Sequence, residues 1–373
     1  MVTHGMAIKL SIASAVYNLD EAFLRAHIER IEEQLNDETE LLLIDDCSTN
    51  NSGEVCMEYA KANSKIRYIN MGENGGLSRV RNRSIEEAQG KWIFFADGDD
   101  MLSAHFVETA LRFCDTDAEI IIHDRLKFIE ELPADDPCSV NELSKLPKEA
   151  GRVLSISCLC LDHSMSAQFG LSSRAFYHAA WGAIYNKEFL VEKNLLFPPG
   201  QKKAQDSVFN TEVYYYAEKI FYLPYVMYFY RGNPQGITRR YSKDLPPIFN
   251  SLLDWLGKDK NKFYPDDEDV DFRFLNHRII SITVDYMRLN IFHKDNPKSK
   301  EERKADFLAF IDTEPYKSAI AAFDPKASDR WEWLLVVKLI RKKNFSALDK
   351  FVGNDKAFGK LCGAYKRIAK IFG

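Results

Sequence analysis

The sequence lacks the long hydrophobic segments that would direct a protein into or across a membrane. No apolar run reaches the roughly 20 residues needed to span a bilayer. The longest candidate, residues 333–340, is short and contains a lysine. The first ten residues, MVTHGMAIKL, have no long apolar core of the kind found in signal peptides. We therefore expect a cytoplasmic protein.

The sequence also lacks closely spaced cysteine motifs and an excess of positive charge. The seven cysteines include no Cys-x-x-Cys motif, a pattern that suits a reducing compartment. Cys158, Cys160 and His163 lie close together in the sequence, but a fourth ligand is missing, so buried thiols are favoured over a zinc site. The formal net charge of -5 argues against a nucleic-acid partner, which would usually require a basic excess.

The first part of the chain alternates between two kinds of segment. Continuous apolar runs, typical of buried parallel strands, alternate with segments that have helical periodicity. We expect strands at residues 7–16, 40–46, 65–71, 91–98 and 118–124, and helices at 20–35, 52–62, 77–89 and 104–113. This alternation predicts an α/β fold with a mostly parallel sheet flanked by helices.

The pattern changes in the second half of the chain. Residues 130–151 are acidic and irregular, which indicates an insertion or a mobile loop. After residue 243, long helix-like segments dominate. We therefore predict two domains, an α/β domain at residues 1–243 and an α-helical domain at residues 244–373.

Acidic residues gather at two predicted strand ends. Asp45 and Asp46 follow one apolar run, and Asp97, Asp99 and Asp100 follow another within the stretch IFFADGDD. Ligands bind outside the carboxyl ends of the strands in sheets of this kind. Closely set carboxylates there can bind a hard cation such as Mg2+ or Mn2+. The alternative for both clusters is a solvated turn.

A glycine-rich loop leads into an arginine-rich helix between residues 74 and 84, NGGLSRVRNRS. Glycine backbone permits a ligand to approach closely, and the N-terminus of a helix favours anions. The alternative is a surface helix that balances nearby acids. The loop is not a phosphate-binding Walker loop, because no Gly-Lys-Ser/Thr follows the glycines.

Four segments in order, VYN, LLLIDDCSTNNS, NGGLSRVRN and GKWIFFADGDD, resemble the family 2 glycosyltransferases with a GT-A fold. The resemblance covers roughly residues 7–240. It implies an inverting, metal-dependent enzyme that uses Mn2+ or Mg2+. Such an enzyme would move a sugar from a UDP-sugar to a hydroxyl of a glycan or lipid-linked acceptor, in the synthesis of a bacterial surface polysaccharide.

The resemblance also assigns roles to individual residues in the nucleotide-sugar site. Asp46 would bind the uracil ring, and Asp45 would shape that pocket. Arg81 would lie near the nucleotide or its pyrophosphate, with Asn74 and Gly75 in the same site.

In the same resemblance, Asp97 would contact ribose or sugar hydroxyls. Asp99, with Asp100 nearby, would hold the metal that bridges the pyrophosphate. One departure from the family pattern is Cys47, where relatives often have glycine. We expect this cysteine to be tolerated unless the position needs a positive φ.

The second half of the resemblance concerns the acceptor. Relatives carry an acidic pair at the start of a helix, and this chain has Gln205 and Asp206 there. Asp206 would be the general base, although an aspartate at a helix N-terminus also suits the helix dipole. Trp181 would line the acceptor side, with core packing as the alternative. Residues 236–238 resemble a loop that covers the donor in relatives.

The C-terminal stretch, residues 356–373, has apolar residues at helical spacing and basic residues between them. It could form a peripheral membrane contact, or pack on its own domain. Two other functions remain as alternatives to the transferase. One is a non-catalytic nucleotide- or glycan-binding protein. The other is a sugar-1-phosphate nucleotidyltransferase, for which the first strand lacks the expected basic glycine-rich loop.

Overall fold

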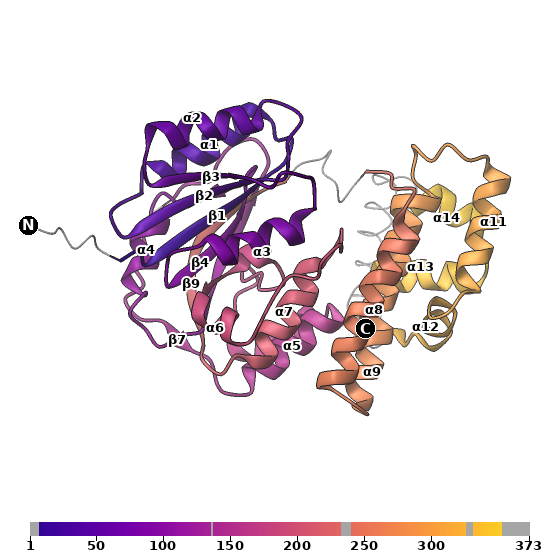
Figure 1. Cartoon of the computed structure of the whole chain (residues 1–373). Helices are drawn as coiled ribbons and strands as arrows, with labels where there is room; N and C mark the ends of the chain where they lie inside the picture. The colour runs from indigo at the N-terminus through magenta and orange to yellow at the C-terminus, as the bar shows by residue number, and fades with distance from the viewer. Residues whose placement is uncertain (1–6, 136, 233–239, 326–330, 353–373) are drawn as a thin grey trace, which may run out of the picture. The chain divides into compact units, whose positions relative to one another are not determined.

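The computed structural model describes residues 7–135, 137–232, 240–325 and 331–352, of which residues 331 and 332 are described by backbone alone. The chain forms two compact units (Figure 1). The first comprises Met1–Cys158 and His163–Asn233, and the second comprises Leu159–Asp162 and Pro234–Gly373. The boundary at residue 243 stays a prediction. The predicted loop at 236–238 and the C-terminal segment 356–373 lie outside the described residues.

The first unit is built on one nine-stranded sheet with the order β3-β2-β1-β4-β8-β6-β9-β5, and β7 also pairs with β9. Every residue of β2 is buried, as the continuous apolar run predicted. The strands are β1 (Leu10–Val16), β2 (Thr39–Asp45), β3 (Ile66–Asn70), β4 (Trp92–Asp97), β5 (Met101–Leu102), β6 (Ile120–Phe128), β7 (Ser144–Lys145), β8 (Ala183–Asn186) and β9 (Ile220–Arg231).

Most of the pairing in the sheet is parallel, as predicted, but the sheet also contains antiparallel strands. Strands β3, β2, β1 and β4 run parallel to one another, as predicted. Strand β8 then lies antiparallel between β4 and β6, and β5 and β7 pair antiparallel with β9. Strand β6, predicted at residues 118–124, pairs in parallel with β9. Periodicity in a sequence identifies a strand, but its direction depends on which distant strand it pairs with, so the antiparallel strands could not be predicted.

Helices cover both faces of the sheet, as Figure 1 shows. Residues from α1, α2 and α4 contribute to one apolar cluster on the sheet, and residues from α3, α5, α6 and α7 contribute to the other. The carboxyl ends of β1, β2 and β4 therefore meet at one edge of a layered core. These helices are α1 (Glu21–Glu32), α2 (Ser52–Ala62), α3 (Leu77–Glu87), α4 (Phe106–Arg112), α5 (Ala150–Cys160), α6 (Lys187–Glu192) and α7 (Gln205–Tyr216).

The described part of the second unit is helical, as predicted. Two π-helical segments, Phe274–Ile279 and Met287–Ile291, interrupt its central run of helix. Among the described residues, no helix is both long enough and apolar enough to span a bilayer. The helices are α8 (Leu245–Phe263), α9 (Glu268–Arg273), α10 (Ile280–Tyr286), α11 (Lys300–Ile311), α12 (Tyr316–Ala322), α13 (Trp331–Arg341) and α14 (Phe345–Val352).

Candidate active site

The acidic turn after β4 holds its three carboxylates in different surroundings. Asp100 is 1% exposed, and its two oxygens accept hydrogen bonds from the Tyr228 hydroxyl and the Arg231 backbone N–H, both at 2.6 Å. The Asp99 carboxylate accepts a hydrogen bond from its own backbone N–H and is stabilised by the charge of Arg231, whose Nε donates to the Asp99 carbonyl oxygen at 2.9 Å. Asp97 is paired with Arg81 and both oxygens of Asp100 accept hydrogen bonds, so Asp99 is the carboxylate of this turn with the weakest protein partners.

Burial and mutual repulsion make the charged forms of these acids costly. Burial raises the pKa of Asp97 to about 6, although the Arg81 guanidinium acts in the opposite direction. Burial also raises the pKa of Asp99. The pKa of Asp100 is raised well above its ordinary value, first by burial and then by Asp97 and Asp99. A bound cation would offset all three effects, because an opposite charge favours the ionised carboxylate.

The backbone of this turn is tied to α1 by a buried histidine that the sequence motifs did not identify. His27 Nδ1 lies 2.8 Å from the carbonyl oxygen of Asp100, and His27 Nε2 lies 2.8 Å from Ser14 Oγ on β1. A carbonyl can only accept, so Nδ1 carries the proton and Nε2 accepts from the serine. Burial lowers the pKa of His27 to about 4, which keeps the ring neutral at physiological pH.

One buried arginine joins two of the predicted site residues across the fold. Arg81, on α3, is 3% exposed and contacts Asp97 Oδ1 with Nη2 at 3.0 Å and Asp206 Oδ1 with Nη1. Asp206 lies in the first turn of α7, and its other oxygen accepts from the Ala180 N–H at 3.0 Å. Burial opposes the charge on Arg81, but Asp206 and Asp97 outweigh it and raise the pKa of the guanidinium.

The predicted nucleotide residues form a second group at the end of β2. Asp46 Oδ1 and Oδ2 accept the N–H groups of Gly75 and Gly76, both at 2.8 Å, and Asn74 Nδ2 donates to the Asp46 carbonyl at 3.0 Å. The acid thus holds the glycine-rich loop against the strand end. Asp45 is buried beneath it and accepts hydrogen bonds from the N–H and hydroxyl of Ser48 and from the side chains of Tyr68 and Asn70.

Cys47 occupies the left-handed backbone region, with φ at 59°. The condition under which we expected the cysteine to be unfavourable is therefore met. The left-handed conformation costs a residue with a Cβ roughly 1–2 kcal/mol of conformational free energy, and it does not cost glycine this amount. The Cys47 thiol contacts Asn70 Oδ1 at 3.4 Å, and this weak contact offsets little of the conformational cost.

Trp181 is packed in a stack of aromatic rings. Its indole lies nearly parallel to the Tyr228 ring at 4.7 Å and 7°, and it also stacks on Phe176 and Tyr230. Trp181 is 6% exposed. On one side, the indole contacts Tyr228, whose hydroxyl donates to Asp100 in the acidic turn. On the other side, the preceding residue Ala180 donates its N–H to Asp206, the candidate general base.

Among the described residues, no group of three or more histidine, cysteine or acidic side chains is arranged to hold a metal ion. This includes the Cys158, Cys160 and His163 cluster, for which buried thiols were the favoured alternative. It also means that the acidic turn alone does not supply a complete set of protein ligands for a metal ion. Mg2+ is commonly held by one or two carboxylates together with substrate phosphates, so a single ligand such as Asp99 fits that kind of site.

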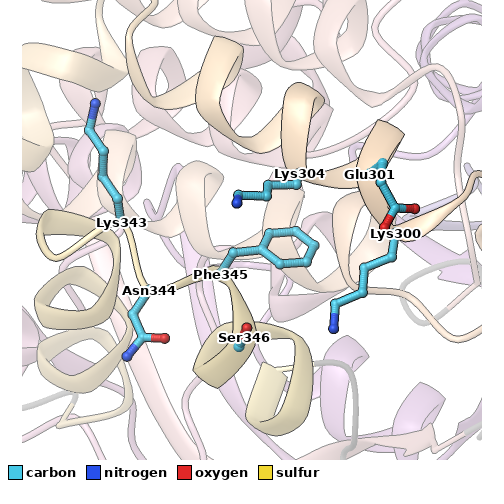
Figure 2. A pocket seen from close by; sticks show the side chains of 7 residues that line it. All are labelled: Lys300, Glu301, Lys304, Lys343, Asn344, Phe345 and Ser346. Carbon is cyan, nitrogen blue, oxygen red and sulfur yellow. The ribbon is translucent and has the colours of Figure 1, made fainter.

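A pocket in the second unit is lined by none of these residues. It has a volume of about 370 Å³ and lies between the start of α11 and the start of α14. Figure 2 shows its three lysine side chains pointing in different directions, so they do not converge on one anion. Lys343 Nζ lies 3.7 Å from Asp312 Oδ2. The lining residues are Lys300, Glu301, Lys304, Lys343, Asn344, Phe345 and Ser346.

Comparison with known proteins independently supports the resemblance to glycosyltransferases. EpsJ of Bacillus subtilis, called an uncharacterized glycosyltransferase, is 30% identical over 233 residues, which are 61% of this chain and 62% of EpsJ. The glycosyltransferase GlyA of Streptococcus pneumoniae is 29% identical over 259 residues, 69% of this chain and 35% of GlyA. The chain thus spans less than two thirds of the length of these relatives.

The fold is similar to that of a solved structure from S. aureus. TarS residues 1–349, crystallised in complex with UDP-GlcNAc, superimpose with a TM-score of 0.59 at 15% identity, covering 94% of this chain and 92% of that one. The likeness confirms the predicted GT-A architecture. Residues 11–167, which contain the acidic turn, Arg81 and the Asp45–Asp46 pair, match the family model "Glycosyl transferase family 2". This part of the chain is therefore similar to glycosyl transferase family 2.

Proposed function

We propose that the protein is an inverting glycosyltransferase that moves a sugar from a UDP-sugar to a hydroxyl group of a glycan or lipid-linked acceptor. The observation that carries this proposal is the contact of Arg81 with both Asp97 and Asp206. It joins the acidic turn expected to bind the donor with the carboxylate expected to activate the acceptor. The family 2 domain supports the same activity.

The donor nucleotide would lie at the ends of β2 and β4. Asp46 already accepts two backbone N–H groups, but each carboxylate oxygen has two lone pairs, so it can accept a further hydrogen bond from a uracil N–H. Arg81 Nε is buried without a hydrogen-bond partner, so the guanidinium would act on the diphosphate through its charge rather than through this N–H. The complex of TarS with UDP-GlcNAc supports a UDP-sugar as the donor.

A divalent cation, Mn2+ or Mg2+, would be held at the acidic turn by Asp99. Such an ion supplies Lewis-acid stabilisation of the charge that grows on the departing diphosphate. Asp100 was predicted as a second ligand, but both of its oxygens already accept hydrogen bonds from Tyr228 and Arg231. In our proposal Asp100 therefore supports the turn, and Asp99 contacts the ion together with phosphate oxygens.

Asp206 would act as the general base toward the acceptor hydroxyl. Its side chain is 19% exposed, so one side of the carboxylate remains accessible while Arg81 and the Ala180 N–H fix its orientation. A positioned base of this kind contributes roughly 10²- to 10⁴-fold to the rate. A direct attack assisted by this base, without a covalent intermediate, would invert the anomeric configuration.

The variants Asp206→Asn and Asp97→Asn test these roles as a matched pair. Each removes one carboxylate from Arg81, so both disturb the same ion pair. We expect Asp206→Asn to lower kcat by at least 100-fold with UDP affinity nearly unchanged, and Asp97→Asn to weaken binding of the UDP-sugar. Loss of UDP binding in a folded Asp206→Asn protein would contradict the base assignment. Circular dichroism would establish that both variants are folded.

We further propose that the enzyme works in the synthesis of a bacterial surface polysaccharide, as a cytoplasmic protein with a peripheral membrane contact. The name of the TarS relative, a poly(ribitol-phosphate) beta-N-acetylglucosaminyltransferase that is 23% identical over 232 residues, supports this class of acceptor. Vesicle pelleting with and without residues 356–373 tests the membrane contact. Equal pelleting of both proteins would remove it.

A further inference from the structure

Arg125 on β6 is a partly buried cation without a counter-ion. Its Nε is buried and has no hydrogen-bond partner, and no carboxylate pairs with its guanidinium among the described residues. The guanidinium lies over the ring of Phe176, 4.7 Å from the centroid. Burial lowers the pKa of Arg125, so the surroundings act against its charge.

This arrangement differs from that of Arg81, the buried arginine of the candidate active site. Arg81 contacts two carboxylates, and its pKa is raised in spite of burial. A guanidinium that loses water without gaining an anion is costly, because buried charges are normally paired. A contact with an aromatic face provides only about 0.5–2 kcal/mol of compensation. The position of Arg125 therefore indicates that an anion from outside the protein pairs with its guanidinium.

The local backbone explains how Arg125 reaches this position. The pairing of β6 with β9 changes register between His123 and Asp124 and again between Asp124 and Arg125. Such bulges re-aim side chains and are frequent beside active sites. The Arg125 N–H then bonds to the Arg174 carbonyl at 3.0 Å, which fixes the strand next to the segment that carries Phe176.

Arg125 is linked to the candidate active site by a continuous row of side chains. Phe176 stacks on Trp181 at 5.5 Å, and the backbone N–H of Ala180, next to Trp181, binds Asp206. Tyr230 stacks on the same indole at 5.7 Å. Burial raises the pKa of Tyr230, the three acids of the turn raise it further, and Arg125 lowers it. Arg125 is thus connected to Asp206 through Phe176, Trp181 and the neighbouring Ala180.

We propose that Arg125, with Phe176 and Trp181, forms a subsite for an anionic group of the acceptor, a phosphate or a carboxylate. This inference rests on the proposed function, because it takes Asp206 as the base that the acceptor must reach. The planar guanidinium presents a pair of N–H donors that matches the oxygens of either group. The acceptor is then a charged glycan or a phosphate-containing chain rather than a neutral sugar.

Binding of small anions to the full-length protein tests the subsite. The protein is first saturated with UDP and Mn2+, and glycerol 3-phosphate, methyl glucuronide and neutral glycerol are then titrated by calorimetry. We expect at least one anion to bind 10-fold or more tightly than glycerol. We expect Arg125→Gln to remove that preference, and Arg125→Lys to retain part of it. Arg174→Gln, an exposed neighbour, should bind like the wild type.

The outcome separates this inference from the proposed function. UDP affinity in the absence of any acceptor reports the donor site alone, and it should be the same in Arg125→Gln as in the wild type. If UDP binds but no anion is preferred over glycerol, the subsite is wrong and the donor site stands. An equal loss in Arg174→Gln would also overturn the subsite. If UDP binds to neither the wild type nor the variants, the proposed function itself fails.

Discussion

The Tyr228 hydroxyl connects the two sides of the acidic turn, and removing it is a sharp test of how that turn is held. The hydroxyl donates to Asp100 Oδ2 at 2.6 Å and accepts the Asp97 N–H at 3.2 Å. Tyr228→Phe deletes both hydrogen bonds but keeps the ring, and with it the stack on Trp181 at 4.7 Å. The variant therefore isolates the hydroxyl from the packing of the side chain.

The expected cost follows from the two bonds. A hydrogen bond to a charged group contributes about 1.5–3 kcal/mol and an ordinary one about 0.5–1.5 kcal/mol, so Tyr228→Phe should lower the unfolding free energy by about 2–4.5 kcal/mol. Burial already raises the pKa of Asp100, and the Tyr228 hydrogen bond acts against that rise. Its loss raises the pKa further. A less charged and less constrained turn should bind Mn2+ more weakly.

Tyr222 on the same strand provides a matched control. Its hydroxyl donates to Asp124 Oδ1 at 2.7 Å and accepts the Ser172 N–H at 3.3 Å, which is the same bonding pattern away from the acidic turn. Tyr222→Phe should therefore cause a similar loss of stability. Only Tyr228→Phe should weaken the Mn2+-dependent binding of UDP.

Two measurements decide the prediction. Urea unfolding gives the stability of the wild type and both variants, and calorimetry gives UDP affinity at several Mn2+ concentrations. A Tyr228→Phe protein within 0.5 kcal/mol of the wild type would refute the bonding argument. Equal losses of Mn2+-dependent binding in both variants would show that the effect is general rather than a property of the acidic turn.

Three further predictions concern the metal, the buried histidine and the strained cysteine. EDTA should suppress sugar transfer and added Mn2+ or Mg2+ should restore it, since a cation would offset the burial that raises the pKa of Asp99; turnover that persists in EDTA would contradict the metal role. Because burial lowers the pKa of His27 to about 4, the stability linked to it is present above pH 6.5 and lost as the pH falls toward 4. Between pH 6.5 and 4, the unfolding free energy of His27→Gln measured with urea should fall by up to about 3 kcal/mol less than that of the wild type. An unchanged pH profile would argue against a neutral imidazole. Cys47→Gly should raise the unfolding free energy by up to about 1 kcal/mol, because glycine adopts φ of 59° without steric cost; a less stable variant would refute the strain.

Much of the first unit follows from local sequence patterns. The apolar run before Asp45 and Asp46 predicted a buried strand, and β2 is that strand. Asp20 was predicted by position to begin a helix, and its side chain caps α1 by accepting the N–H groups of Ala22 and Phe23. Such features depend on neighbours within a few residues, so they can be recognised without the fold.

The contacts that define the site depend on distant parts of the chain. Nothing near Arg81 in the sequence indicates that its guanidinium meets Asp206, 125 positions away. His27 has no motif that links it to the Asp100 carbonyl, and the signal that could have drawn attention to it is a polar residue on the apolar face of a predicted helix. Arg125 is likewise one arginine among many until its surroundings are known.

The sequence by itself determined which segments form strands and helices, and which acids follow the strand ends, because periodicity and charge are local properties. Tertiary structure decided the antiparallel placement of β8, the pairing of Arg81 with both Asp97 and Asp206, and the lack of a carboxylate partner for Arg125 within the described part of the chain. Burial is the physical reason for the difference. Whether a charged side chain is solvated, paired or left without a partner is settled only when distant segments remove water from around it.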